Sequence, residues 1–257
     1  MNLWIQHQRL LIGFIACCMI GLNSQLQARE IQLESPVESV TVLELFTSHG
    51  CSSCPPADKW IRQFSQNQGL WSKVIPMAFH VDYWDYLGWK DRFARSKYSK
   101  RQRQYRESGG IRAVYTPGFV VNGREWRGWF SGGTPELSPG KKVGRLTARI
   151  TPNSQISATF KPITQESHSD INAHVVILGF GISSDIGGGE NSGRELKADF
   201  VVLGDSSATS TDSLQWIIPW PIIRDSGATR LAIVVWLSRK GDPAPIQAVA
   251  GWLGSNN

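Results

Sequence analysis

The chain has 257 residues, of which 41% are hydrophobic and 19% are charged, and its formal charge is +6. This apolar content is sufficient for a packed core and excludes a chain that is disordered overall. Four cysteines in a chain of this length are too few for the disulfide-rich scaffold of a small secreted domain. Only one segment is apolar enough to enter a membrane, which excludes a polytopic membrane protein.

The N-terminal residues have the pattern of a secretory signal. The apolar run Leu10–Leu22 is followed by polar residues and by Ala28, a small residue before a cleavage point. This run is shorter than the ~20 residues of a spanning helix but suits a signal sequence. Residues 1–28 are interpreted as a signal peptide, with retention as an N-terminal anchor as the alternative. Cleavage removes Cys17 and Cys18, leaves no stable membrane span, and sends the protein to the periplasm or outside the cell.

The first half of the mature chain alternates strands with helices. Three apolar runs have the composition of buried strands: Val40–Phe46, Val74–Val81 and Phe119–Val121. Helices are predicted after Pro55 and from Tyr86 to Ser108, because prolines suit a first helical turn and the longer segment is polar and uninterrupted. This order predicts an α/β domain with parallel strands over residues 29–131.

The second half has a different pattern. Glycines and prolines mark residues 132–142 as a linker. Strand-like runs then follow without a convincing helix between them: Val143–Ile150, Gln155–Lys161, Ile171–Gly181, Glu195–Leu203, Leu214–Ile218, Thr229–Leu237 and Ile246–Leu253. These runs predict an all-β, sandwich-like domain over residues 143–257. It contains no nucleophile–base arrangement and is interpreted as a binding or docking module.

Cys51 and Cys54 form a C-x-x-C motif between a predicted strand and the start of a predicted helix. The amide donors and partial positive charge of a helix start lower the pKa of a thiol such as Cys51. Cys54 is then placed to resolve a mixed disulfide. The motif therefore predicts a dithiol redox site. Two alternatives stay open: an inert disulfide, and a metal site that also recruits His49, His80 or a carboxylate.

Four polar or aromatic residues are candidates for the surroundings of the cysteines. His49 can stabilise a Cys51 thiolate by charge and hydrogen bonding, or it is only a polar loop residue. His80, Asp82 and Trp84 follow the second strand, and the carboxyl ends of parallel strands share one edge of a sheet. Asp82 is the best candidate for a polar role, whereas Trp84 either forms a wall for a peptide substrate or packs the following helix.

The segment Lys90–Arg106 carries eight Lys or Arg residues and one acidic residue. No nucleic-acid recognition motif accompanies this charge, so it is interpreted as a solvated helix face, and nucleic acid is not an expected partner. The glycine run Gly187-Gly188-Gly189 lacks the helix that a phosphate-binding loop requires. No cofactor is predicted.

Several motifs together carry a resemblance to known families. Residues 38–128, with the C-x-x-C helix and a later proline before a strand and hairpin, resemble the thioredoxin superfamily. A closer resemblance is to an uncharacterised secreted thioredoxin-like family, known as a domain of unknown function. Its motifs here are Glu44–Ser48, Cys51–Asp58, Phe79–Asp85, Tyr115–Pro117 and Gly189–Arg194.

The resemblance implies a thioredoxin-like α/β fold for the first domain. It also implies that Glu44 is a buried acid beneath Cys54 that relays its proton, and that Pro117 is cis and lies with Thr116 beside the cysteines. Ser52-Ser53 replaces the Gly-Pro pair of ordinary thioredoxins, so their reduction potential is not inherited.

The sequence therefore predicts an exported thiol–disulfide oxidoreductase whose partners are proteins or peptides that carry disulfides or thiols. A noncatalytic binding protein is the main alternative, and a copper or zinc carrier is a weaker one. No metal ligand set is assigned, and neither the substrate, the direction of electron flow nor the oligomeric state follows from the sequence.

Overall fold

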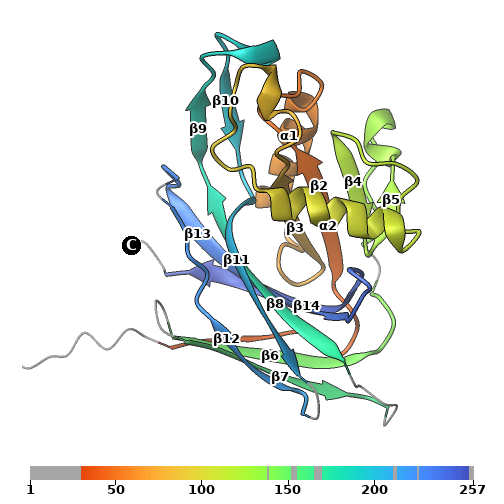
Figure 1. Cartoon of the computed structure of the whole chain (residues 1–257). Coiled ribbons are helices and arrows are strands. Elements are labelled where there is room, and N and C mark those ends of the chain that lie inside the picture. Colours follow the sequence, from red (N-terminus) through yellow and green to blue (C-terminus); the bar gives the residue numbers. More distant parts are fainter. Residues whose placement is uncertain are drawn as a thin grey trace, which may run out of the picture.

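A computed structural model describes residues 30–137, 139–151, 155–164, 170–210, 213–224 and 226–254. The predicted signal peptide, residues 1–28, lies outside the described residues. Within them, no helix is both long enough and apolar enough to cross a membrane. The elements are labelled in Figure 1.

Strands dominate the described part of the chain. The strands of the first half are β1 (Ile31–Glu34), β2 (Thr41–Thr47), β3 (Val74–His80), β4 (Gly118–Val121) and β5 (Arg124–Trp126). Those of the second half are β6 (Gly144–Thr151), β7 (Gln155–Pro162), β8 (Ile171–Phe180), β9 (Ile182–Asp185), β10 (Glu195–Ala198), β11 (Val201–Ser210), β12 (Gln215–Pro219), β13 (Arg230–Arg239) and β14 (Pro245–Leu253). The two described α-helices are short: α1 (Pro55–Arg62) and α2 (Ser96–Glu107).

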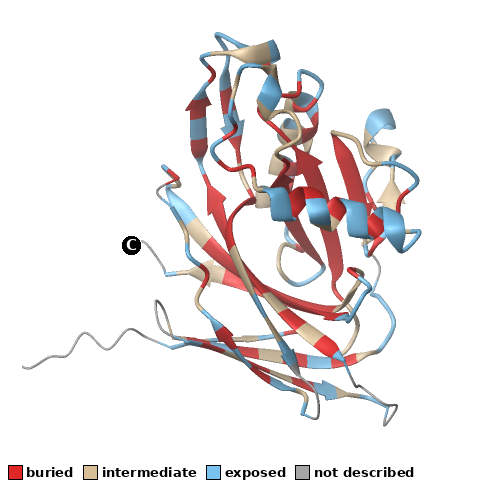
Figure 2. Cartoon of the chain, viewed as in Figure 1, coloured by how far each residue is buried: buried red, intermediate tan, exposed pale blue. Residues whose placement is uncertain are grey.

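One large sheet joins both halves of the sequence. Its eight strands lie in the order β14-β13-β8-β11-β3-β2-β4-β5 (Figure 1). In this sheet β3 pairs in parallel with β2 on one side and with β11 on the other. The strands β2 and β3 are buried along their whole lengths (Figure 2), as expected for the centre of a covered sheet.

The predicted fold class, a thioredoxin-like α/β domain followed by an all-β sandwich-like domain, is therefore wrong. The described chain is mostly β, and the strands of the two halves form one continuous sheet instead of two separate structures. The physical reason is the pairing of β11 with β3, which joins segments far apart in the sequence. Local hydrophobic patterns predict strands but do not specify which distant strands pair.

Two predicted elements also have different bounds. The helix predicted from Tyr86 to Ser108 is confined to α2, because the chain before it bends at Gly88 (φ +89°) and buries Asp91. The run predicted as a strand from Glu195 to Leu203 is divided between β10 and β11 by Phe200, whose φ is 61°.

A second sheet, in the order β1-β6-β7-β12, covers one end of the large sheet. Its strands alternate buried and more exposed residues, as a sheet with one covered face requires. Leu146, Ile150 and Trp216 of this sheet share a core with Val175 and Val235 of the large sheet. This apolar layer holds the two sheets together without contributing to the cysteine loop.

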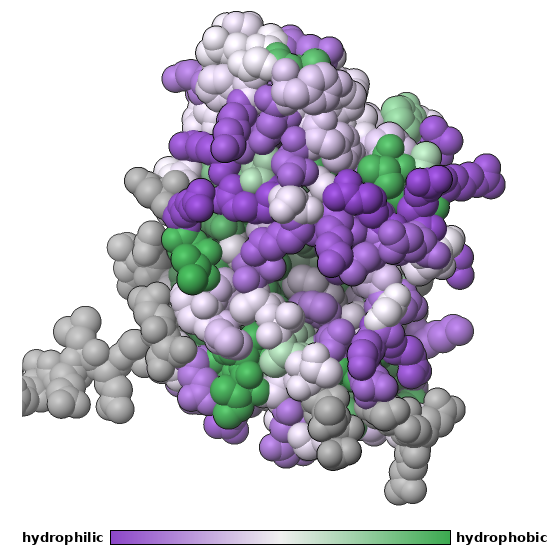
Figure 3. Space-filling view, in the orientation of Figure 1, coloured by the Kyte–Doolittle hydropathy of each residue, from purple (hydrophilic) through white to green (hydrophobic). Residues whose placement is uncertain are grey.

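The helix α2 lies against one face of the large sheet and is tied to it by a buried ion pair. Glu44 of β2 accepts hydrogen bonds from Arg101 Nε (2.6 Å) and Nη2 (2.9 Å) and from the Tyr105 hydroxyl (2.5 Å). Arg101 Nη2 also donates to the carbonyl of Pro243, which precedes β14. The opposite side of α2 is exposed and hydrophilic (Figure 3), and Lys100 and Arg103 lie there.

Replacing Arg101 by Met is expected to lower the free energy of unfolding by about 3–5 kcal/mol, because it leaves the Glu44 carboxylate buried without its cation. Urea unfolding measures the change. Arg103→Met, on the exposed side of the same helix, is the matched control and is expected to stay within about 0.5 kcal/mol of wild type. Equal effects of the two substitutions would show that the buried pair does not stabilise the fold.

Candidate functional site

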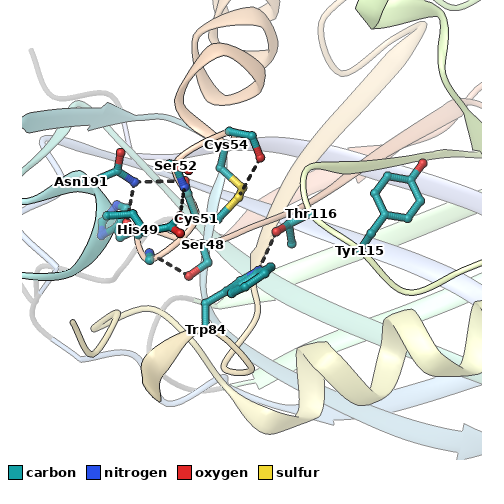
Figure 4. The surroundings of a disulfide bond; sticks show 12 residues. Ser48, His49, Cys51, Ser52, Cys54, Trp84, Tyr115, Thr116 and Asn191 are labelled. Atoms are coloured by element: carbon teal, nitrogen blue, oxygen red, sulfur yellow. Dashed lines mark hydrogen bonds between the residues drawn. A yellow bond between two sulfur atoms is a disulfide. The ribbon is translucent and has the colours of Figure 1, made fainter. Parts of the chain in front are cut away.

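Cys51 and Cys54 form a disulfide where β2 ends and α1 begins (Figure 4). Cys54 is the N-cap residue of α1, and prolines fill the first two helical positions, where no amide donor is needed. The loop is closed by backbone hydrogen bonds from Cys51 N to Ser48 O (3.2 Å) and from Cys54 N to Cys51 O (3.2 Å). Cys51 is 3% exposed and Cys54 is fully buried, so only Cys51 of the pair offers a surface to a partner.

Asp58 lies one helical turn beyond Cys54. Its backbone N–H donates to the Cys54 carbonyl at 3.1 Å, and residues four apart on a helix share one face. Burial raises the pKa of Asp58 to about 6, against the opposing influence of His80. Asp58 is not among the site residues predicted from the sequence, although its spacing of four residues from Cys54 on a predicted helix indicates a shared face.

An open groove between α1 and β10 reaches Asp58. It has a volume of about 500 Å³ and is lined by Pro55, Pro56, Asp58, Lys59, Arg62, Arg194, Glu195, Leu196 and Lys197. Through this groove, a proton on the carboxyl group of Asp58 can exchange with solvent.

Glu44, the predicted buried acid, lies on the other face of the sheet. Neighbouring residues of a strand point to opposite faces, and Glu44 points to α2. The α1 residue Trp60 instead packs on Phe119 at 5.0 Å, and Phe119 is paired with Leu45. Glu44 is therefore buried, as predicted, but the structure does not bring it to Cys54.

A buried ion pair lies on the α1 face, where His80 is in register with Thr47. His80 Nδ1 is 2.7 Å from Asp91 Oδ2, and backbone N–H groups of His49 (2.8 Å) and Phe93 (3.0 Å) donate to the same carboxylate. Burial alone would lower the pKa of His80, but the charge of Asp91 raises it above its usual value. Burial opposes the charge of Asp91, but His80 and His49 hold the pKa of that carboxyl well below its usual range.

The side chain of His49 has a different electrostatic state. Burial lowers the pKa of His49 to about 4, so its imidazole is neutral at pH 7. Its ring packs edge-on against His80 and Phe93. The predicted stabilisation of a Cys51 thiolate by a positive charge on His49 is therefore not available near neutral pH.

Three side chains could together hold a metal ion. Donor atoms of His49, His80 and Asp91 lie within 4.8 Å of one another, and all three residues are buried. Both oxygens of the Asp91 carboxylate already accept hydrogen bonds, one of them from the His80 ring. The arrangement that the structure describes is therefore an ion pair between His80 and Asp91. The predicted alternative of a metal held by cysteines gains no support, because neither Cys51 nor Cys54 belongs to this described group.

Trp84 and Thr116 lie together beside the cysteine loop. Trp84 Nε1 donates to Thr116 Oγ1 at 2.7 Å (Figure 4). The backbone of Gly50 approaches Trp84 so closely that a Cβ on Gly50 would be 3.1 Å from the Trp84 Cβ. The peptide bond between Thr116 and Pro117 is cis, as predicted.

Asp82 is engaged elsewhere. Its carboxylate accepts a hydrogen bond from the Ser99 hydroxyl at 2.5 Å, and its backbone N–H donates to the same hydroxyl at 3.2 Å. These bonds tie the chain after β3 to α2. Asp82 follows β3, at the same end of the sheet as the cysteine loop, and its side chain is hydrogen-bonded to α2.

The loop between β9 and β10 contributes two residues that are not among the site residues predicted from the sequence. The buried Asn191 side chain donates to the carbonyls of His49 (2.8 Å) and Cys51 (3.0 Å) (Figure 4). Glu190 Oε2 accepts a hydrogen bond from Ser52 N at 3.0 Å. The motif Gly189–Arg194 was visible in the sequence, but its contact with the cysteines depends on the pairing of distant strands.

Comparisons with known proteins give similar folds without an assigned activity. None of the curated proteins matches this chain. A crystal structure of an Agrobacterium tumefaciens protein is 24% identical, with a TM-score of 0.55 over 86% of this chain and 97% of that one. HBP35 of Porphyromonas gingivalis is 15% identical, with a TM-score of 0.53 over 85% of this chain and 76% of that one. At these identities the likenesses support the fold alone.

The family comparison covers most of the chain. Residues 42–238 match the family described as a protein of unknown function, DUF1223. This stretch runs from β2 through the cysteine loop and the β9–β10 loop into β13. The predicted resemblance to a family of unknown function is thus confirmed, and the protein belongs to the DUF1223 family.

Proposed function

We propose that the protein is an exported thiol–disulfide oxidoreductase that acts on disulfides or thiols of proteins or peptides through Cys51 and Cys54. The observation that carries the proposal is the disulfide at the N-terminus of α1. A disulfide that closes so small a loop adds little stability to a fold. A helix N-terminus, in contrast, stabilises a thiolate. The location therefore suits thiol exchange better than a structural crosslink.

Export is the part of the proposal that depends on the sequence of residues 1–28. A signal of this type leads to an oxidising compartment, where disulfides form and persist. There the protein would keep Cys51 and Cys54 as its two cysteines after cleavage.

The exchange takes place in two steps. In the reducing direction, the Cys51 thiolate attacks one sulfur of a substrate disulfide, and the other substrate sulfur leaves as a thiolate. The Cys54 thiol then loses its proton and attacks Cys51 Sγ, which forms the Cys51–Cys54 disulfide and releases the second substrate thiolate. The dithiol loses two electrons and the substrate gains them. The reverse order oxidises a substrate dithiol.

Asp58 is the proton acceptor for Cys54 in this scheme. It shares a helix face with Cys54, and a carboxyl group with a pKa of about 6 is better matched to a thiol than an ordinary aspartate. The groove between α1 and β10 lets the proton pass to solvent. The positive charge of His80, fixed by Asp91, opposes a further rise of this pKa.

Trp84 and Thr116 supply a surface for the substrate chain beside the cysteine loop. The ring of the exposed Tyr86 stacks on that of Trp84 at 6.4 Å, which extends the aromatic surface outward. An apolar or aromatic segment flanking a substrate disulfide would pack on these rings.

Substitution of the cysteines is expected to separate the two steps. Cys51→Ser removes the attacking sulfur and should reduce exchange with a small disulfide reporter to the uncatalysed rate. Cys54→Ser retains the first step but not the second, so a mixed disulfide between Cys51 and the reporter should accumulate. Mass spectrometry of the unreduced protein detects it. The proposal is wrong if both variants exchange at the wild-type rate.

Asp58→Asn is expected to slow the resolving step by about 10²-fold, because it removes the proton acceptor. In wild type the rate of this step should rise as the pH increases through about 6, where Asp58 ionises, and the variant should lack this rise. Rapid-mixing kinetics with a preformed mixed disulfide measures both. Glu195→Gln changes a carboxylate in the same groove and should leave the rate and its pH profile unchanged.

Asp58→Asn is expected to slow the resolving step but to stabilise the fold, so a slower rate could not be explained by misfolding. The raised pKa of Asp58 means that the folded state binds its proton more tightly than the unfolded state. Stability is therefore lost as the pH rises from the ordinary range of an aspartate through about 6. Asp58→Asn removes that loss and should unfold at a higher urea concentration than wild type at pH 7. A resolving step of normal rate in this stable variant would exclude Asp58 as the proton acceptor.

A further inference from the structure

The loop between β9 and β10 places a carboxylate next to the attacking cysteine. Glu190 Oε2 accepts a hydrogen bond from the backbone N–H of Ser52, the residue that directly follows Cys51. The bond is 3.0 Å long and joins positions that are 138 residues apart in the chain. Although Glu190 is on the surface, this bond gives its carboxylate a defined position.

The loop that carries Glu190 is anchored on the cysteine loop. Its neighbour Asn191 is fully buried and donates to the carbonyl of Cys51 at 3.0 Å. Arg194 Nη1 in turn donates to Asn191 Oδ1 at 2.8 Å. The backbones also meet on the other side of the loop, where a Cβ on Gly188 would be 2.5 Å from the carbonyl oxygen of Gly88. The anchors fix Glu190 relative to Cys51.

A carboxylate in this position acts against a thiolate on Cys51. A thiolate is stabilised by nearby N–H groups that are free to donate to it. The N–H of Ser52, which lies between Cys51 and the N-cap of α1, already donates to Glu190. The two negative charges also repel each other. Hydrogen bonds from Ser52 lower the pKa of Glu190, so the carboxylate is ionised at pH 7.

Other charged groups near the cysteine loop do not remove this effect. On the side of β3, His80 and Asp91 form an ion pair whose charges largely cancel, and the pKa of about 4 keeps His49 neutral. On α1, Asp58 adds a negative charge when it is ionised, and the positive charge of Arg62 on the same helix opposes the rise in the pKa of Asp58. On the β9–β10 loop itself, the guanidinium group of Arg194 donates a hydrogen bond to Asn191 and not to Glu190.

We propose that Glu190 is a tuning residue of the Cys51–Cys54 dithiol: by occupying the Ser52 N–H and placing a carboxylate beside Cys51, it disfavours the thiolate and makes the dithiol a stronger reductant. This inference rests on the proposed redox function. The couple concerned is the loss of two electrons and two protons by the dithiol as the disulfide forms, with glutathione disulfide as the electron acceptor in the test below.

The test compares four proteins in glutathione redox buffers at pH 7. Glu190→Gln retains the shape of the side chain but removes its charge. It should lower the pKa of Cys51 by about 0.5–1 unit and shift the equilibrium constant about 3- to 10-fold toward the dithiol. Glu190→Asp retains the charge and should stay close to wild type. Glu195→Gln is the matched control, because its carboxylate accepts a hydrogen bond from Ser183 instead of the cysteine loop. Thiolate absorbance against pH gives the pKa, and alkylation followed by mass spectrometry gives the equilibrium.

A second measurement separates charge from shape. At about 1 M salt the Debye length falls to about 3 Å, so the difference between wild type and Glu190→Gln should shrink. The inference is overturned if Glu190→Gln matches wild type, or if Glu190→Asp shifts as far as Glu190→Gln. In both cases the proposed redox function stands, provided that the disulfide equilibrates with glutathione. A disulfide that does not equilibrate with glutathione in any of the four proteins overturns the redox function and this inference together.

Discussion

The parallel pairing of β11 with β3 determines where the rest of the molecule lies. The backbone N–H of Ala78 in β3 donates to the carbonyl of Phe200 at 2.8 Å, immediately before β11. The chain turns at Phe200, where φ is positive. Because of this turn, β10 lies outside the large sheet and pairs with β9, and the β9–β10 hairpin lies beside α1 (Figure 1). Without this pairing, neither the groove at Asp58 nor the contact of Asn191 with the cysteine loop would form.

Two buried ion pairs lie on opposite faces of the large sheet, and only one of them is near the disulfide. On the α2 face, Glu44 and Arg101 hold a helix in place and are remote from the disulfide. On the α1 face, His80 and Asp91 form a pair whose positive member acts on Asp58. Because adjacent strand positions point to opposite faces, a shift of one residue in β2 would exchange these surroundings.

The sequence was sufficient for the local features and insufficient for the long-range ones. The apolar runs of β2 and β3 and the helix start after Cys54 have local signatures, and the structure contains them. The cis bond before Pro117 is also present, but it was implied by the family resemblance and not by a local pattern. The short extent of α2 could not be seen, because the preceding segment is shaped by the burial of Asp91 against His80 and His49. A carboxylate among charged residues gives no local sign that it will be buried.

The predicted position of Glu44 beneath Cys54 was wrong for a related reason. The family resemblance implied that Glu44 is buried, but the face on which it lies depends on register, and Glu44 points to α2. The position of Asp58 on α1 depends only on helical spacing from Cys54, which the sequence contains. Contacts made by Glu190 and Asn191 require the assembled sheet and have no counterpart in local spacing.

The hydrogen bond from Asn191 to the cysteine loop determines which fragments of the chain can keep the site intact. The hydrogen bond from Asn191 to the Cys51 carbonyl spans 140 positions. A fragment that stopped before β9 would retain both cysteines, α1 and the strand before them, yet it would lose the side chain that holds this carbonyl and would expose the edge of β3. The first part of the chain alone therefore does not contain the complete cysteine site, because the site needs residues from the second part of the chain.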